Sequence, residues 1–197
     1  MTAAPARTVA VLLAAGSGAR FGGDKLGALV GAQTILERSA GALAASGCDE
    51  RVAIVSAASR IHEALLVEYG FHVLVNPSAR EGMASSIRAG VAWAEARGAD
   101  AALIALADMP FIPVAHFVRL FEKFGQSAGG LSYSANAGQR MPPAIFASRW
   151  FGRLQTFEGD AGARALLDKA SATDGVEAAA GAFDDIDSQE DVRRFNR

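Results

Sequence analysis

The sequence predicts a three-layer α/β fold with a mostly parallel sheet and a small antiparallel extension. Apolar, strand-like runs alternate four times with helix-like segments, the first run is continuously apolar, and a glycine-rich loop follows it directly. In folds of this class the crossovers between parallel strands are right-handed, and ligands bind beyond the carboxyl ends of the strands. Residues that follow strands are therefore the first candidates for a functional site.

Strand and helix alternate regularly through the first half of the chain. Residues 9–14 form a continuous apolar run, as expected of a strand covered on both faces. Thr34 and Glu37 fit a capping box that begins a helix ending near Gly47. The further predicted elements are a strand at 51–56, a helix at 59–69, a strand at 71–75, a helix at 85–97 and a strand at 101–107.

The second half is less regular. The predicted elements are a helix at 113–124, short strands at 130–134 and 144–146 that would form the antiparallel extension, and helices at 160–167 and 188–195. At 197 residues the chain has the usual length of one domain, and no internal boundary is evident. We therefore expect a single domain over residues 1–197.

Composition excludes several classes of function. The formal net charge is −2 and 51% of residues are hydrophobic, so neither a disordered chain nor a broadly basic nucleic-acid-binding surface is expected. Cys48 is the only cysteine, which excludes an internal disulfide and a thiolate metal site and suits a reducing compartment. The apolar run at 9–15 is too short for a signal peptide or membrane span, so we expect a cytoplasmic protein without a membrane partner.

The loop after the first strand has the composition of a polyphosphate-binding turn. Its glycines are Gly16, Gly18, Gly22 and Gly23, and it carries two cations, Arg20 and Lys25. Glycines let backbone N–H groups approach an anion, and the cations add charge at the same turn, so the loop predicts a nucleoside triphosphate site; solvated loop charges are the alternative. A dinucleotide fingerprint fails because Phe21 replaces its third glycine, and an NTPase phosphate loop fails because Lys25 precedes Leu26.

Asp108 follows an apolar strand and should emerge beside the glycine-rich loop. Magnesium commonly binds through one or two carboxylates together with substrate phosphates, so Asp108 is predicted to hold Mg²⁺; a turn aspartate is the alternative. Asp187, which closes a cluster with Asp184 and Asp185, is a candidate second ligand, with solvated turn acids as the alternative.

Ser85 and Ser86 lie at a predicted helix N-terminus on the same edge of the sheet. Hydroxyl and free N–H groups there can bind a base, ribose or phosphate, or the serines can simply cap the helix. The three histidines are widely spaced and Cys48 lies in a connecting loop, so none of these residues is assigned a catalytic role. The histidines are His62, His72 and His116.

Residues 13–25 resemble the signature loop of the nucleotidyltransferases that act on the molybdenum cofactor. Four further blocks resemble those of molybdenum cofactor cytidylyltransferases, so that the likeness spans nearly the whole chain. These blocks are residues 82–90, 106–110, 159–164 and 185–191. The form Leu-Ala-Ala-Gly, with Ala15, accompanies cytidine in this family, whereas guanylyl relatives usually carry Leu-Ala-Gly-Gly.

The resemblance implies a Rossmann-like nucleotidyltransferase fold and transfer of a cytidylyl group from CTP to the molybdopterin-type cofactor with Mg²⁺. It also implies delivery of the product to a molybdoenzyme or its chaperone. The implied catalytic residues are Arg20, Lys25 and Asp108. The implied nucleotide-binding residues are Leu13, Ala14, Ala15, Gly16, Gly18, Arg20, Lys25, Ser85, Ser86 and Asp108. Guanylyl or other nucleotidyl transfer, and a non-catalytic cofactor carrier, are the alternatives.

The segment expected to face the acceptor departs from the family pattern. Where the family often has Arg-Gly-His-Pro, this chain has Arg140-Met141-Pro142-Pro143. The resemblance implies acceptor contacts from Arg140, Pro143 and Asp160, and the replaced glycine and histidine leave the acceptor's identity open. No general base is required, because a phosphate nucleophile is already ionised near neutral pH and charge neutralisation can supply the catalysis.

Overall fold

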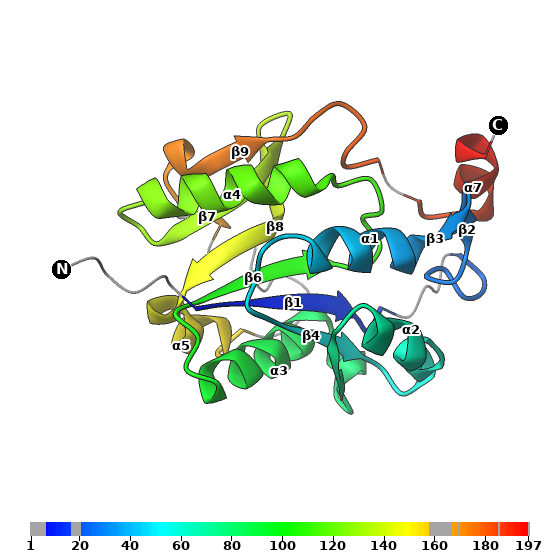
Figure 1. Ribbon diagram of the computed structural model, residues 1–197, viewed down its shortest axis with the longest axis horizontal. Helices are drawn as coiled ribbons and strands as arrows, with labels where there is room; N and C mark the ends of the chain where they lie inside the picture. Colours follow the sequence, from blue (N-terminus) through cyan, green and yellow to red (C-terminus); the bar gives the residue numbers. More distant parts are fainter. Residues whose placement is uncertain (1–6, 17–20, 158–166, 169, 185, 197) are drawn as a thin grey trace.

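The computed structural model describes residues 7–16, 21–157, 167–168, 170–184 and 186–196. A seven-stranded sheet forms its centre, in the order β5-β4-β1-β6-β8-β7-β9 (Figure 1). The parallel half consists of β1 (Thr8–Ala14), β4 (Glu50–Val55), β5 (His72–Val75) and β6 (Ala101–Leu106). The predicted α/β class and mostly parallel sheet are confirmed.

Helices cover both faces of the sheet, which gives the three layers. On one face lie α1 (Ile35–Ala44) and α4 (Val114–Gln126), and on the other lie α3 (Met83–Ala96) and α5 (Phe151–Leu154) (Figure 1). Alternate β1 residues point to opposite faces: Val11 belongs to the core under α3, and Leu12 to the core under α1 and α4. The first strand is therefore buried on both sides, as its apolar run predicts.

Helix α3 lies close to β1 because residue 90 is glycine. A Cβ atom at Gly90 would overlap the Val11 side chain. Glycine at this position therefore lets the middle of α3 pack closely on β1.

The remaining elements form the antiparallel extension and the connections. Strand β8 (Gln139–Ala147) pairs antiparallel with both β6 and β7 (Leu131–Asn136), and β9 (Gly175–Glu177) pairs parallel with β7. A separate ribbon is formed by β2 (Leu29–Val30) and β3 (Gln33–Thr34). The shorter helices are η1 (Ala58–His62), α2 (Glu63–Glu68), η2 (Ala79–Glu81), η3 (Ser148–Trp150), η4 (Ala172–Asp174) and α7 (Gln189–Phe195).

Several predicted boundaries need correction. The predicted helix at 59–69 is a 3-10 turn followed by a short α-helix, and the predicted strand at 144–146 is the end of the longer β8. The two prolines of β8 concealed its first half, since proline cannot donate to a strand ladder. The capping boxes at Thr34 and Ser188 are present, whereas most of the predicted helix at 160–167 lies outside the described residues.

No helix in the described part of the chain is both long enough and apolar enough to cross a bilayer.

Candidate active site

The glycine-rich loop and Asp108 follow the ends of two neighbouring strands, β1 and β6. Strands β1 and β6 are paired in parallel with Leu13 opposite Leu106, and the Ala107 N–H donates to the Leu13 carbonyl at 3.0 Å. Strand β1 ends at Ala14 and β6 ends at Leu106, so that Ala15 and Asp108 follow at the same edge of the sheet. This is the edge where open α/β sheets bind ligands.

Lys25 joins this edge to the C-terminal part of the chain. Its Nζ atom donates to Asp108 Oδ2 at 2.9 Å and to Asp187 Oδ1 at 3.0 Å. The Lys25 side chain is only 12% exposed, whereas Asp108 and Asp187 are 42% and 54% exposed. The ammonium is thus covered while both carboxylates remain open to solvent.

The ionisation of Lys25 is controlled by two opposing effects. Burial alone would lower the pKa of the ammonium, but the charges and hydrogen bonds of Asp108 and Asp187 outweigh it, so the pKa is raised above its usual value. Lys25 therefore stays cationic throughout the neutral range. This single positive charge is available to neutralise carboxylate or phosphate oxygens.

A small apolar cluster brings Asp187 to the loop. Phe21 from the loop packs with Ile186, together with Val30 and Ile35. Helix α7 follows, and the side chain of Asn196, directly after the helix, accepts from the Gly31 N–H at 2.6 Å. Packing of these segments places Asp187 within reach of Lys25 although the two residues are 162 positions apart.

The carboxylate arrangement fits a divalent cation. Asp108 and Asp187 both bond to one ammonium, which acts as a stand-in cation at the point where the two carboxylates converge. Hard oxygen donors of this kind suit Mg²⁺ or Mn²⁺. Within the described ranges no group of three or more acidic, histidine or cysteine residues could hold a metal, so substrate phosphates or water would complete the coordination.

One family model matches most of the chain. The MobA-like NTP transferase domain matches residues 10–175. The chain belongs to this family. Nucleotidyl transfer is the chemistry of such a domain, and a divalent metal typically accompanies it.

Two sequence relatives extend the comparison. The chain is 34% identical over 122 residues to the purine catabolism protein PucB of Bacillus subtilis, a match that covers 60% of this chain and 58% of PucB. It is 32% identical over 164 residues to the nicotine blue oxidoreductase of Paenarthrobacter nicotinovorans, with 80% and 79% of the two chains covered. The match thus spans a little over half of PucB and most of the second relative.

Solved structures share the fold. Rv0371c from Mycobacterium tuberculosis has a TM-score of 0.78 at 24% identity, with 96% of this chain and 98% of that chain covered. A nucleotidyl transferase from Methanothermobacter thermautotroptrophicus also has a TM-score of 0.78, at 23% identity, with 96% of each chain covered. The complex of Rv0371c with manganese has a TM-score of 0.75 at 23% identity, with 96% of this chain and 97% of that chain covered.

The remaining residues of the glycine-rich loop that are predicted to bind nucleotide range from buried to exposed in this MobA-like domain. The Leu13 and Ala14 side chains belong to the core, Ala15 is half-buried and Gly16 is exposed, so Leu13 and Ala14 could contribute backbone atoms only. Gly18 and Arg20 lie outside the described residues.

Ser85 and Ser86 point inward. Both are buried and accept hydrogen bonds from the Asn76 amide at 2.9 and 3.1 Å, and the Ser85 hydroxyl lies 2.8 Å from the Ser78 carbonyl. Their hydroxyls therefore hold the loop before α3. Neither serine caps the helix, because the N-cap is Gly82, which has no side chain that could accept from the first N–H groups of α3. Because both side chains are buried, a nucleotide contact from Ser85 or Ser86 would have to come from the backbone.

Two of the three predicted acceptor-binding residues, Arg140 and Pro143, lie on β8. Arg140 donates through one nitrogen to the carbonyls of Leu167 and Ala170, at 2.6 and 2.7 Å, and its guanidinium lies over the Tyr133 ring. The Pro143 carbonyl accepts from the Ser134 hydroxyl at 2.7 Å. Arg140 thus holds the segment that precedes β9 through two of its carbonyl groups. Asp160 lies outside the described residues.

Two histidines have contacts that the sequence did not indicate. His62 contacts Asp24, the residue before Lys25, with 2.9 Å between Nε2 and Oδ1. His116 is fully buried, and its Nε2 donates to the Ser134 hydroxyl at 2.8 Å. Asp24 and Ser134 lie 38 and 18 positions away from their histidines, so no local sequence pattern indicates either contact.

Proposed function

We propose that the chain transfers a cytidylyl group from CTP to the molybdenum cofactor and releases pyrophosphate. The observation that carries this proposal is the convergence of Lys25, Asp108 and Asp187 beside the glycine-rich loop. Cation and carboxylates together provide what phosphoryl chemistry at a triphosphate requires, which is charge neutralisation and positioning. The resemblance of residues 82–90 to a block of the cytidylyltransferases, and Ala15 in the glycine-rich loop, support CTP.

The proposed reaction is a single displacement at phosphorus. An oxygen of the cofactor's terminal phosphate forms a bond to the α-phosphorus of CTP, while the bond from that phosphorus to the bridging oxygen breaks. Pyrophosphate leaves with the electron pair. The nucleophile is already ionised, so no side chain has to accept its proton, which is consistent with a site where no histidine contacts Lys25, Asp108 or Asp187 among the described residues.

The chain's own residues would act through charge. Lys25, with its raised pKa, would neutralise oxygens of the leaving pyrophosphate. Asp108 and Asp187 would hold Mg²⁺, which when bound supplies charge neutralisation of the triphosphate. The manganese in the complex of Rv0371c supports a divalent metal, and the choice of Mg²⁺ is part of the proposal.

The acceptor is the least constrained part of this proposal. The relatives are named for purine catabolism and for nicotine blue oxidoreduction, so their names do not share one substrate. The proposed acceptor follows from the resemblance of this chain's own blocks, with Arg140, Pro143 and Asp160 as its predicted contacts. A molybdoenzyme or its chaperone would receive the product.

The test is a product analysis with four nucleotides. The protein is incubated with molybdenum cofactor, Mg²⁺ and CTP, GTP, ATP or UTP, and released pyrophosphate and the mass of the product are measured. We expect pyrophosphate and a cytidylylated cofactor with CTP. A guanylylated product would assign the protein to guanylyl transfer, and cofactor binding without pyrophosphate release would assign it to a carrier; either result overturns the proposal.

A further inference from the structure

The loop that carries Lys25 is attached to a second segment through a histidine. His62, the last residue of η1, has its Nε2 atom 2.9 Å from Oδ1 of Asp24. A carboxylate can only accept, so the imidazole N–H donates. The His62 side chain is 13% exposed, and the contact bridges 38 positions of sequence. It is therefore a tertiary contact between a largely covered ring and a carboxylate that is 52% exposed.

The same carboxylate oxygen closes the turn around Lys25. Asp24 Oδ1 also accepts from the Gly27 N–H at 3.1 Å. A Cβ atom at residue 27 would overlap Asp24 Oδ2 and lie 3.4 Å from the His62 ring, so glycine leaves the space that the carboxylate occupies. Asp24 Oδ1 thus binds both His62, at the end of η1, and Gly27. Lys25 lies in the sequence between Asp24 and Gly27, inside the turn that this bond closes.

The residues of the turn that follow Lys25 are attached to the start of α1 by separate backbone hydrogen bonds. The Leu36 N–H donates to the Leu26 carbonyl at 3.0 Å, and the Ile35 N–H donates to the Ala28 carbonyl at 2.9 Å. These bonds fix the turn to the start of α1 after Lys25. On the side before Lys25, Phe21 packs in the apolar cluster with Ile186, and the His62 to Asp24 contact adds a hydrogen bond from a side chain outside the loop.

We infer that His62 is a positioning residue for nucleotide binding: it holds Asp24, and through the turn it holds the Lys25 ammonium where the triphosphate binds. This inference rests on the proposed nucleotidyl transfer. Preorganisation matters here because ordering a loop upon binding reduces affinity. His62 itself would touch neither nucleotide nor metal and would act only through Asp24.

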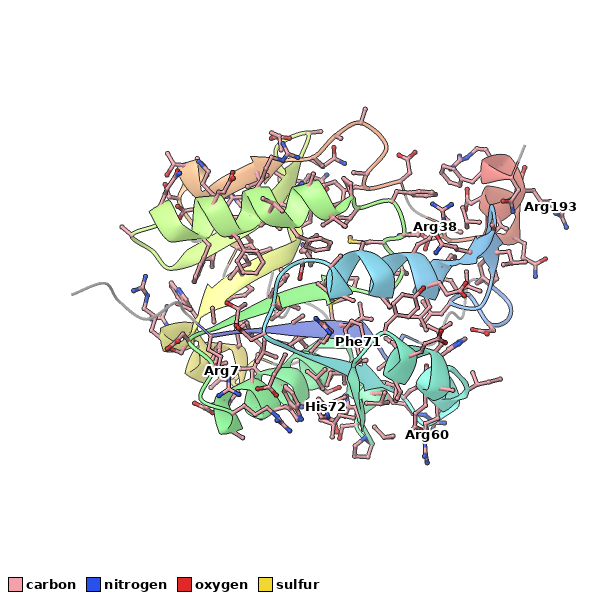
Figure 2. All side chains as sticks on the ribbon, in the orientation of Figure 1. Arg7, Arg38, Arg60, Phe71, His72 and Arg193 are labelled. Carbon is pink, nitrogen blue, oxygen red and sulfur yellow. The ribbon has the colours of Figure 1, made fainter. Side chains whose placement is uncertain are left out.

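The test compares variants with a matched control on the same helical turn. His62→Phe keeps the ring but cannot donate, and His62→Gln restores an N–H donor at a similar position. Arg60→Ala is the control, since Arg60 pairs with Glu63 on the surface and projects from the periphery of the molecule (Figure 2). Gly27→Ala displaces the Asp24 carboxylate without changing either partner.

Two measurements separate positioning from catalysis. Hydrogen exchange of the peptide covering residues 21–28, without nucleotide, reports the order of the turn itself. Equilibrium binding of CTP with Mg²⁺ and steady-state kinetics report the functional consequence. We expect His62→Phe to accelerate exchange and to weaken nucleotide binding about tenfold, since a lost hydrogen bond to a charged group has an effect of this order.

The expected pattern has three further parts. The nucleotide KM rises more than kcat falls, His62→Gln recovers most of the affinity, and His62→Phe adds little in a Gly27→Ala background because both changes release the same carboxylate. Thermal melting of each variant controls for global unfolding.

The outcomes distinguish this inference from the proposed function. Exchange and affinity of His62→Phe equal to those of Arg60→Ala would overturn the positioning role, even if transfer is demonstrated. Faster exchange in a protein that binds no nucleotide would leave His62 as a structural anchor of the loop and would overturn both proposals. Faster exchange and weaker nucleotide binding without product formation would support the positioning role and count against the transfer reaction alone.

Discussion

The Lys25 ammonium lies 2.9 Å from the Asp108 carboxylate, although 83 positions separate the two residues. The parallel pairing of β1 with β6 accounts for their proximity, because it brings the ends of both strands to one edge of the sheet. Asp187 joins the same ammonium from near the C-terminus. This one cation pairs with two carboxylates, and in the proposed site it would compete with a metal for the same oxygens.

Replacing Asp108 should abolish metal-dependent turnover. The side chain is 42% exposed and belongs to neither core, so Asp108→Ala should fold normally. Loss of a group that stabilises transition-state charge typically reduces kcat about 100-fold to 1,000-fold. Pyrophosphate release under saturating nucleotide and Mg²⁺ measures the effect. Glu68→Gln, at an exposed carboxylate of α2, is the control, and unchanged turnover of Asp108→Ala would contradict the assignment.

Replacing Lys25 should have opposite effects on metal and nucleotide. In Lys25→Met the carboxylates of Asp108 and Asp187 lose their common counter-ion, so Mn²⁺ alone should bind about tenfold more tightly, because a nearby positive charge opposes the metal. Nucleotide should bind more weakly, since a cation facing its phosphates is lost. Calorimetric titration with Mn²⁺, and then with nucleotide, tests both the expected gain in Mn²⁺ affinity and the expected loss in nucleotide affinity. Equal Mn²⁺ affinity in the variant and the unaltered protein would show that the ammonium does not compete.

Replacing Arg140 should reduce stability. Its guanidinium donates to the carbonyls of Leu167 and Ala170, and Arg140→Ala would leave both acceptors without this partner. Hydrogen bonds to charged groups contribute about 1.5–3 kcal/mol each, so the free energy of unfolding should fall by an amount of that order. Urea denaturation measures it. A rise in the KM for the acceptor with no change in stability would instead indicate that Arg140 serves mainly to bind the acceptor.

The sequence predicted those parts of the molecule whose signals are local. The continuous apolar run of β1 and the Thr34 capping box each contain their own signal, and both are present. Asp108 could be placed beside the loop because strand ends in a parallel sheet share an edge. Strand β8 was only partly predicted, because Pro142 and Pro143 interrupt the strand pattern.

The contacts that the sequence could not predict are those between distant segments. Nothing near His62 indicates a partner 38 positions earlier, and nothing near Ser85 indicates that the hydroxyl turns inward to Asn76. Asp187 was a candidate ligand within an acidic cluster, but its selection over Asp184 depends on the packing of Ile186 beneath the loop. Tertiary packing decides these positions, and local residue patterns do not encode it.

His116 should make the protein sensitive to acid. Burial first, and then the charge of Arg119, lower the pKa of His116 from 6.5 to about 4. Its Nδ1 accepts from Arg119 at 3.2 Å and its Nε2 donates to the Ser134 hydroxyl, which leaves no site for a second proton. Between pH 6.5 and about 4 the unfolded chain binds a proton that the folded chain does not, so stability falls as the pH falls through this window.

The expected loss is about 1.4 kcal/mol per pH unit inside that window. It should be absent from His116→Gln, which keeps a donor for Ser134 but does not titrate. Urea denaturation of both proteins at pH 7, 6 and 5 measures the difference between the two slopes, which cancels the contribution of the carboxylates that they share. Parallel pH profiles for the two proteins would contradict the prediction, because His116 would then be protonated equally easily in the folded and unfolded chains.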